Sequence, residues 1–141
     1  MYHCNSFPMF HNLIHLQLVY QRYNAHWSQV LELLHHCPKL QLLAINQPDI
    51  HSFHFEQIQK GEWQLPPSVP QCLLLHLKRC YLNHYRGTKP EFEFARYSMH
   101  NGRFLKSMTI STGIAKNPKF KMLKELSSCK RGSATCRLCF K

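Results

Sequence analysis

One spacing of apolar side chains recurs five times in this chain of 141 residues. In each copy, apolar residues stand three and five positions after a first residue, as Cys80 and Leu82 follow Leu77. The copies start at Leu13, Leu40, Leu77, Leu105 and Thr135, at intervals of 27, 37, 28 and 30 residues. We number the positions of each copy by their offset from its first residue, so that Cys80 and Leu82 occupy the third and fifth positions. These two positions share one side of a strand because side chains alternate along it. A repeat of about 20 to 50 residues indicates a solenoid, in which neighbouring units stack to form one core.

A helix is expected between the third and fourth copies. Thr88 and Glu91 form a capping-box pattern, in which the hydroxyl and the carboxylate satisfy backbone donors of the first turn. Pro90 is tolerated there because its missing N–H would have had no helical partner. Gly102 is placed to end the helix. The unit therefore reads as strand, helix, strand, which is the connection that parallel strands need.

Two further segments have helical spacing. The first is 27–36, and the second is 117–128, where Phe120, Leu123 and Leu126 are expected to share the core-facing side. Together with the recurring strands, these segments predict an α/β fold. We expect a short leucine-rich-repeat-like solenoid of about five parallel strands with helices on the convex side.

The long interval between the second and third copies breaks this rhythm. It holds four prolines, at Pro48, Pro66, Pro67 and Pro70, and a short helix over 71–76 is expected just before the third strand. We divide this part of the chain into an irregular lead-in (1–12), a leucine-rich-repeat-like unit (13–46) and a junction loop (47–70).

Composition restricts the compartment and the class of protein. The seven cysteines are an odd number, and several lie in apolar settings where free cysteine acts as a small hydrophobe. This favours a reducing compartment, the cytoplasm or the nucleus. We find no secretory signal pattern and no apolar run long enough to cross a bilayer, so no membrane partner is expected.

Charge is divided unevenly along the chain. Residues 1–77 hold three basic and four acidic residues, whereas residues 78–141 hold 15 basic and three acidic ones. A basic half is typical of nucleic-acid or acidic-partner binding, but also of a solvated lysine-rich surface. The arginines that could form a basic strip are Arg79, Arg86, Arg96, Arg103 and Arg137.

Side chains at the second and fourth positions of each copy should point away from the core, because they alternate with the apolar positions. Solenoids use such an extended sheet surface for binding. The outward rows are His15 and Gln17, Leu42 and Ala44, Arg79 and Tyr81, Ser107 and Thr109, and Arg137 and Cys139. From these we select as the candidate partner-binding residues His15, Gln17, Arg79, Tyr81, Ser107, Thr109 and Arg137.

A catalytic or metal site is not indicated. Cys136 and Cys139 are three apart, which on a strand places them on opposite sides, and no second ligand pair completes a zinc site. A nucleophile at Cys37 or Cys80 would need an orienting acid and an oxyanion site, and no acid is placed beside either by sequence. We therefore expect no enzyme activity, no metal and no cofactor.

The second half of the chain resembles a known family. Blocks that match in order include Trp63-x-x-Pro66, Val69-Pro70-x-Cys72-Leu73-Leu74, Tyr85-Arg86-Gly87-Thr88, Glu93-Phe94-Ala95-Arg96-Tyr97 and Ser133-Ala134-Thr135-Cys136. They resemble the plant FBD domain of F-box/FBD/leucine-rich-repeat proteins over residues 60–141. Residues 10–46 look like the leucine-rich repeat that precedes that domain.

The resemblance implies a role in substrate recognition by a ubiquitin ligase. In that family an F-box docks onto a Skp-type adaptor of a cullin ligase, and the repeats and the FBD domain are thought to present a protein substrate. We expect this chain to begin inside the repeats and to lack the F-box, so that any link to the ligase runs through full-length relatives. A truncated, non-functional remnant is the other reading. The strand over Leu16–Val19 would form an open edge, which predicts self-association.

Overall fold

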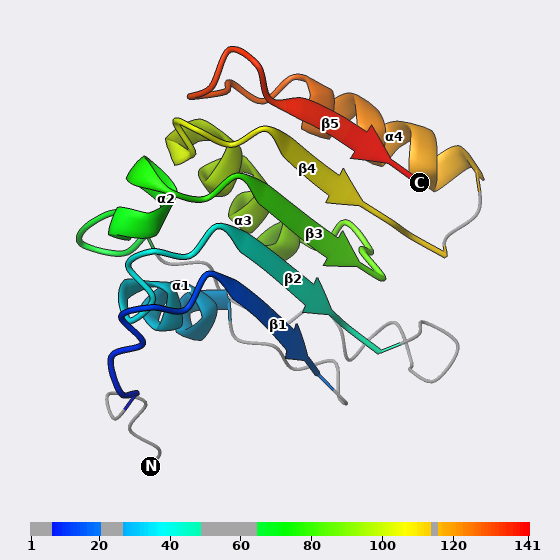
Figure 1. The fold of residues 1–141 in the computed structure, drawn as a ribbon. Helices are drawn as coiled ribbons and strands as arrows, with labels where there is room; N and C mark the ends of the chain where they lie inside the picture. The colour runs from blue at the N-terminus through cyan, green and yellow to red at the C-terminus, as the bar shows by residue number, and fades with distance from the viewer. Residues whose placement is uncertain (1–6, 21–26, 49–64, 114–115) are drawn as a thin grey trace.

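The computed structural model describes residues 7–20, 27–48, 65–113 and 116–141. Within these ranges the chain forms a single five-stranded sheet (Figure 1). Its strands are β1 (His15–Val19), β2 (Leu42–Asn46), β3 (Arg79–Asn83), β4 (Ser107–Ile110) and β5 (Arg137–Phe140). The strands lie in the sheet in chain order, and all neighbouring pairs are parallel. The predicted α/β class with five parallel strands is confirmed.

The register of the strands follows the recurring apolar spacing. The third positions pair across the sheet as one row, and the fifth positions pair as a second row. These rows are Leu16, Leu43, Cys80, Met108 and Leu138, and Leu18, Ile45, Leu82, Ile110 and Phe140. On the three central strands all six of these side chains are buried, and on the outer strands they are half-buried.

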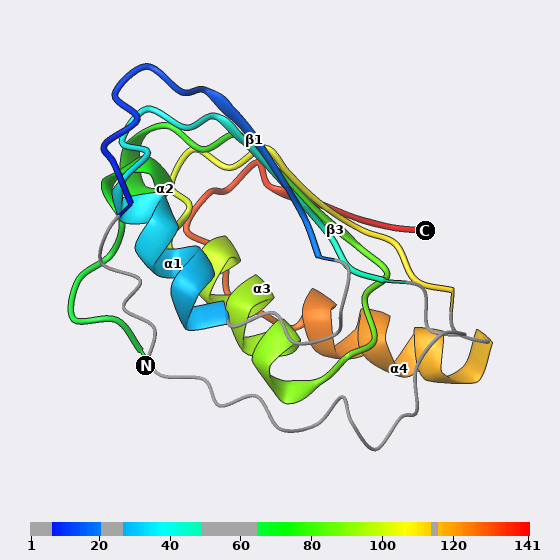
Figure 2. The ribbon, with the colours of Figure 1, turned by 90° about the horizontal axis from the view of Figure 1, so that it is seen from below.

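Four helices pack on one face of the sheet (Figure 2). They are α1 (Trp27–His35), α2 (Gln71–Leu75), α3 (Lys89–Asn101) and α4 (Lys116–Ser127). Trp27 at the start of α1 packs against Phe94 of α3, with ring centroids 4.8 Å apart, and both side chains are buried. In the described part of the chain no helix covers the other face of the sheet.

The predicted start and end of α3 are confirmed. The Thr88 hydroxyl accepts a hydrogen bond from the Glu91 backbone N–H at 3.4 Å, and the Glu91 carboxylate accepts one from the Thr88 N–H at 3.0 Å. At the other end, the Gly102 N–H donates to the Ser98 carbonyl. A Cβ at residue 102 would lie 2.7 Å from that carbonyl oxygen, so glycine is required by the close approach.

One prediction about α4 is wrong. Phe120 was expected to face the core, but its side chain is 69% exposed, whereas Met122 and Leu126 are buried. Met122 and Leu126 are four residues apart and therefore lie on one side of the helix. Phe120 stands two residues before Met122, which places it about 200° around the helix axis. The apolar residues of α4 thus divide between the core and the surface.

Part of the junction loop, residues 49–64 with Trp63, lies outside the described residues, and so do residues 1–6 of the lead-in. The expected short helix before the third strand is present as α2. The proposed domain boundaries stay a prediction. None of the described helices is both long and apolar enough to span a membrane.

Candidate partner-binding surface

The helix-free side of the sheet is formed by the second, fourth and sixth positions of each repeat, and we call it the free face. Figure 1 views the sheet from this side, with the helices behind it. The second positions pair directly across all five strands. This row runs through His15, Leu42, Arg79, Ser107 and Arg137. His15, Arg79 and Arg137 are exposed, while the other two are half-buried.

The fourth positions form the neighbouring row. It runs through Gln17, Ala44, Tyr81, Thr109 and Cys139. Gln17 is exposed and Tyr81 is half-buried. Thr109, in contrast, is only 9% exposed, so it offers little surface to a partner. The structure therefore brings six of the seven candidate residues together with accessible side chains, and their role in binding stays a prediction.

A third row, at the sixth positions, carries polar residues that sequence reasoning missed. Asn83 donates a hydrogen bond from its amide to the Asn46 side chain, and its carbonyl oxygen accepts one from the Ser111 hydroxyl at 3.0 Å. These residues all stand six positions after the first residue of a sequence copy (Leu40, Leu77 and Leu105), and this regularity was visible in the sequence. The row cross-links the carboxyl ends of β2 and β3 and the residue after β4.

The free face is basic over its second half. Arg79 and Arg137 flank Ser107, and Lys78 and Lys106 are exposed at the strand starts beside them. The side chain of neither arginine makes a hydrogen bond or ion pair with any described residue. The acidic side chains of the described ranges, Glu32, Glu91, Glu93 and Glu125, all lie on helices of the opposite side. Within the described ranges, acidic side chains therefore occur on the helix side of the sheet and not on the free face.

The central repeat carries the match to a protein family. A family model described as FBD matches residues 64–110, which include α2, β3, α3 and β4. The chain contains an FBD domain. This confirms the resemblance, and it places Arg79, Tyr81, Ser107 and Thr109 of the free face within the matched residues.

Curated relatives extend the similarity over most of the chain. An F-box/FBD/LRR-repeat protein of Arabidopsis thaliana is 33% identical over 141 residues, covering 94% of this chain and 30% of the relative. An FBD-associated F-box protein of the same plant is 31% identical and covers 94% and 33%. Another F-box/FBD/LRR-repeat protein is 37% identical and covers 93% and 30%. The chain thus spans about a third of these relatives, and no solved structure matches it.

A buried polar network ties the FBD domain to the strand before it. Glu91 is fully buried, and its carboxylate accepts hydrogen bonds from the Arg86 N–H at 3.1 Å and from the Gln47 side-chain amide. The Arg86 guanidinium donates to the Pro48 carbonyl at 2.7 Å. Sequence reasoning found the helix cap at Glu91 but not its contact with Gln47, because the two residues are 44 positions apart. The network fixes the FBD domain against the end of β2.

The arginines that could have formed one basic strip are separated by the fold. Arg79 and Arg137 lie on the free face, but Arg86 is buried, and Arg96 on α3 pairs with Glu93 at 2.9 Å. A strip that includes Arg86 and Arg96 is therefore not formed. Arg79 of β3 and Arg137 of β5 lie on the same surface.

The buried cysteines of the FBD domain are poor nucleophiles. Burial raises the pKa of Cys72 to about 12, with a smaller effect of nearby Cys37, and burial likewise raises the pKa of Cys80 to about 12. Both thiols are protonated at neutral pH, and thiolate is the reactive form. Cys136, which directly precedes β5, is buried, and Cys139 on β5 is exposed. Among the described residues, no group of three potential ligands could hold a metal ion.

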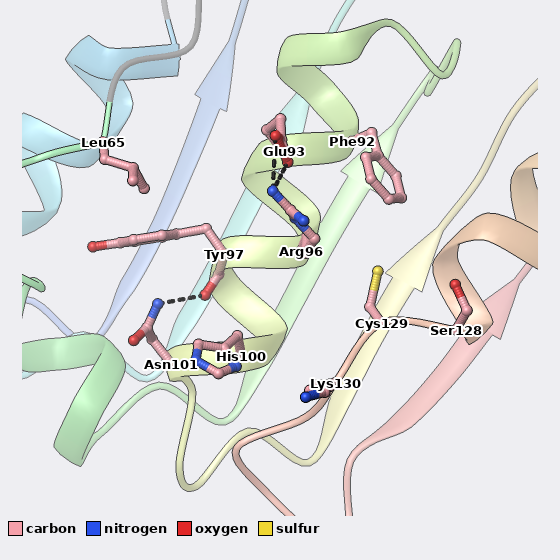
Figure 3. A pocket seen from close by; sticks show the side chains of 10 residues that line it. All are labelled: Leu65, Phe92, Glu93, Arg96, Tyr97, His100, Asn101, Ser128, Cys129 and Lys130. Carbon is pink, nitrogen blue, oxygen red and sulfur yellow. Dashed lines mark hydrogen bonds and ion pairs between the residues drawn. The ribbon is translucent and has the colours of Figure 1, made fainter.

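A cavity of about 490 Å³ lies on the helix side, between α3 and residues 128–130 (Figure 3). Phe92, Tyr97 and Cys129 are among the side chains that line it. Its charged residues are largely engaged, since Arg96 pairs with Glu93 on the cavity wall. Burial raises the pKa of the Cys129 thiol despite two nearby arginines. The cavity thus holds no activated nucleophile, and the free face is the stronger candidate for function.

Proposed function

We propose that this chain is a non-enzymatic protein-interaction module that binds a protein partner on its free face. The observation that carries the proposal is the pairing of Arg79 with Ser107 and of Tyr81 with Thr109 in adjacent rows, on a side of the sheet that no described helix covers. An uncovered sheet surface with aromatic and arginine side chains is typical of binding surfaces, because these two residue types dominate interface energetics. The proposed contact residues are His15, Gln17, Arg79, Tyr81, Ser107 and Arg137, and Thr109, which is only 9% exposed, contributes least to the contact.

We infer that the sheet is a short solenoid of the leucine-rich-repeat type, with its helices on the convex side. The strands in chain order, their parallel pairing and the interval of 28 residues between Leu77 and Leu105 support this inference. The names of the relatives, which include LRR-repeat proteins, also support it. In such an array the concave side is the sheet surface that receives the partner.

The proposed process is substrate recognition by a ubiquitin ligase. Relatives named F-box proteins support a link to a Skp-type adaptor and a cullin, reached directly or through a longer relative. The partner would then be the protein selected for modification, and the module would act in the cytoplasm or the nucleus. The role proposed for the matched region is substrate binding, because the family model that matches residues 64–110 is that of the FBD domain.

An affinity purification from plant cells tests the binding surface. Tagged wild-type chain is compared with Arg79→Ala/Tyr81→Ala, which removes one cation and one aromatic ring from the free face. The matched control is Phe120→Ala/Lys121→Ala, which removes the same chemistry from exposed residues of α4. We expect the double variant on β3 to lose its specific partners and the control to retain them. Equal partner lists for all three proteins would refute the surface assignment.

The same preparation tests self-association. β1 is an outer strand of the described sheet, so its outer edge can template pairing with a second copy. We propose that the isolated chain forms dimers or larger species through this edge. Light scattering after size-exclusion chromatography should give a mass that rises with concentration. A constant monomer mass over a hundredfold concentration range would contradict the proposal.

A further inference from the structure

The cations of the free face are arranged at a fixed spacing. Arg79 and Arg137 occupy the same row on β3 and β5, with Ser107 of β4 between them. Neighbouring strands lie about 4.8 Å apart, so the backbones of the two arginines are separated by about 10 Å. Both side chains are exposed. A ligand that engages both must carry two anionic groups at a similar distance.

An extended peptide that crosses the strands meets this requirement. In the polyproline II conformation three residues rise about 9 Å, and they complete one turn of the helix. Side chains three residues apart therefore point to the same side at nearly the spacing of the two arginines. Each guanidinium can form a bidentate pair with a carboxylate, and the Ser107 hydroxyl between them can donate to a peptide carbonyl.

We propose that the free face binds an extended acidic peptide segment in which two carboxylates are three residues apart, one on Arg79 and one on Arg137. This inference deepens the proposed function and rests on it, since it names the chemistry of the partner. Lys78 and Lys106, which are exposed at the strand starts, add positive potential that attracts such a segment.

No described acidic side chain lies on the free face beside Arg79 and Arg137, so we assign the negative charge that complements them to the partner. All described acidic side chains lie on helices of the opposite side, so none neutralises the two arginines. A nucleic acid fits the same surface less well. Single-stranded nucleic acid binds through several stacking aromatic side chains in a basic groove, whereas Tyr81 is the only Phe, Tyr or Trp residue at the second and fourth positions of the five strands.

Fluorescence anisotropy on the full chain tests the inference. The probes are a labelled peptide with the core Glu-Pro-Pro-Glu in a Gly-Ser context, the same peptide with Gln-Pro-Pro-Gln, and a labelled oligothymidine. The protein variant is Arg79→Gln/Arg137→Gln, which keeps much of the apolar stem of each side chain. The matched control, Lys121→Gln/Lys124→Gln, removes the same charge from exposed positions of α4 on the other side of the sheet. Thermal unfolding followed by circular dichroism verifies that both variants are folded.

We expect the Glu peptide to bind wild type at least ten times more tightly than the Gln peptide. The Arg79/Arg137 variant should lose this tenfold preference and the Lys121/Lys124 control should retain it. Equal losses in both variants would overturn the inference, because binding would then follow net charge alone. Tighter binding of oligothymidine than of the Glu peptide, dependent on the same arginines, would also overturn it in favour of a nucleic acid. If the Glu peptide did not bind wild type even at millimolar concentration, the inference would be overturned as well.

These outcomes can be told apart from those of the affinity purification. If Arg79→Ala/Tyr81→Ala loses the cellular partner but no acidic peptide binds, the interaction module stands and the acidic segment is excluded. If the acidic peptide binds through Arg79 and Arg137 but the partner list is unchanged, the peptide site stands and the cellular partner uses another surface.

Discussion

The two sides of β3 differ although they come from the same five residues. Cys80 and Leu82 point towards the helices and are buried, whereas Arg79 and Tyr81 stand on the free face and reach solvent. The alternation of side chains along a strand is sufficient to produce this division. The difference teaches that packing constrains one side closely, while the other side can carry the chemistry of recognition at little cost to the fold.

The largest expected difference between the two sides is in stability. Leu82→Ala should lower the free energy of unfolding by about 2–5 kcal/mol, because it removes a buried side chain and leaves a cavity. Tyr81→Ala, on the neighbouring outward position, should cost about 1 kcal/mol or less. Urea unfolding of both variants measures the two losses of unfolding free energy. Similar losses would contradict the exposed position of Tyr81, because they would show that its side chain is packed as tightly as Leu82.

The buried network at the start of α3 should come next. Glu91→Ala leaves the Gln47 amide and the Arg86 and Thr88 N–H groups without the carboxylate that they contact, and should cost about 3 kcal/mol. Glu93→Ala, two residues along the helix, removes only a pair with a mostly exposed arginine and should cost less than about 1 kcal/mol. Denaturant titrations compare the two, and a Glu93 effect as large as that of Glu91 would contradict this order.

Alkaline pH should weaken the packed side. Burial raises the pKa of Cys72 and of Cys80 from an ordinary value of 9.0 to about 12. Above pH 9 these thiols ionise in the unfolded chain but not in the folded one, so the stability present below pH 9 is lost as pH rises towards 12. We expect a loss of about 3 kcal/mol between pH 8 and pH 10, about half of it from each thiol. Cys72→Ala/Cys80→Ala should show a smaller loss over that interval, and an unchanged pH dependence would exclude the two thiols as its cause.

The smallest expected effect concerns the polar row at the sixth positions. Asn83→Ala removes the hydrogen bonds to Asn46 and from Ser111 and should cost about 1 kcal/mol. Asn101→Ala breaks only a contact within α3, with the Tyr97 carbonyl, and serves as the control. Hydrogen exchange of the β2 and β3 backbone amides should accelerate in the first variant alone. Equal exchange in both variants would show that the row does not link the strands.

Much of this architecture could be predicted from the sequence. The apolar spacing gave the strands and their register because a parallel sheet with one buried side permits few alternatives. Thr88 and Glu91 gave the start of α3 because capping is local. The outward position of Arg79 and Tyr81 followed from alternation alone.

Other features depended on contacts that no local pattern contains. Gln47 meets Glu91 only after the sheet and α3 have come together, so their hydrogen bond could not be anticipated from spacing. Phe120 stands three positions before the half-buried Leu123 but lies on the exposed side, because the orientation of α4 is set by the buried Met122 and Leu126. The polar row at the sixth positions is also regular in the sequence, but a pattern defined by apolar residues does not include it.

The pairing of each strand with its chain neighbour has an evolutionary consequence. Leu42 pairs with Arg79 across an interval of 37 residues, and Arg79 pairs with Ser107 across an interval of 28, yet all three stand in one row. Connection length therefore does not alter which side chains are displayed together. Insertions and deletions between strands can accumulate without disturbing the displayed row, and a single substitution within it changes one displayed side chain and leaves the others in place. Such a fold can vary its exposed chemistry while keeping its frame.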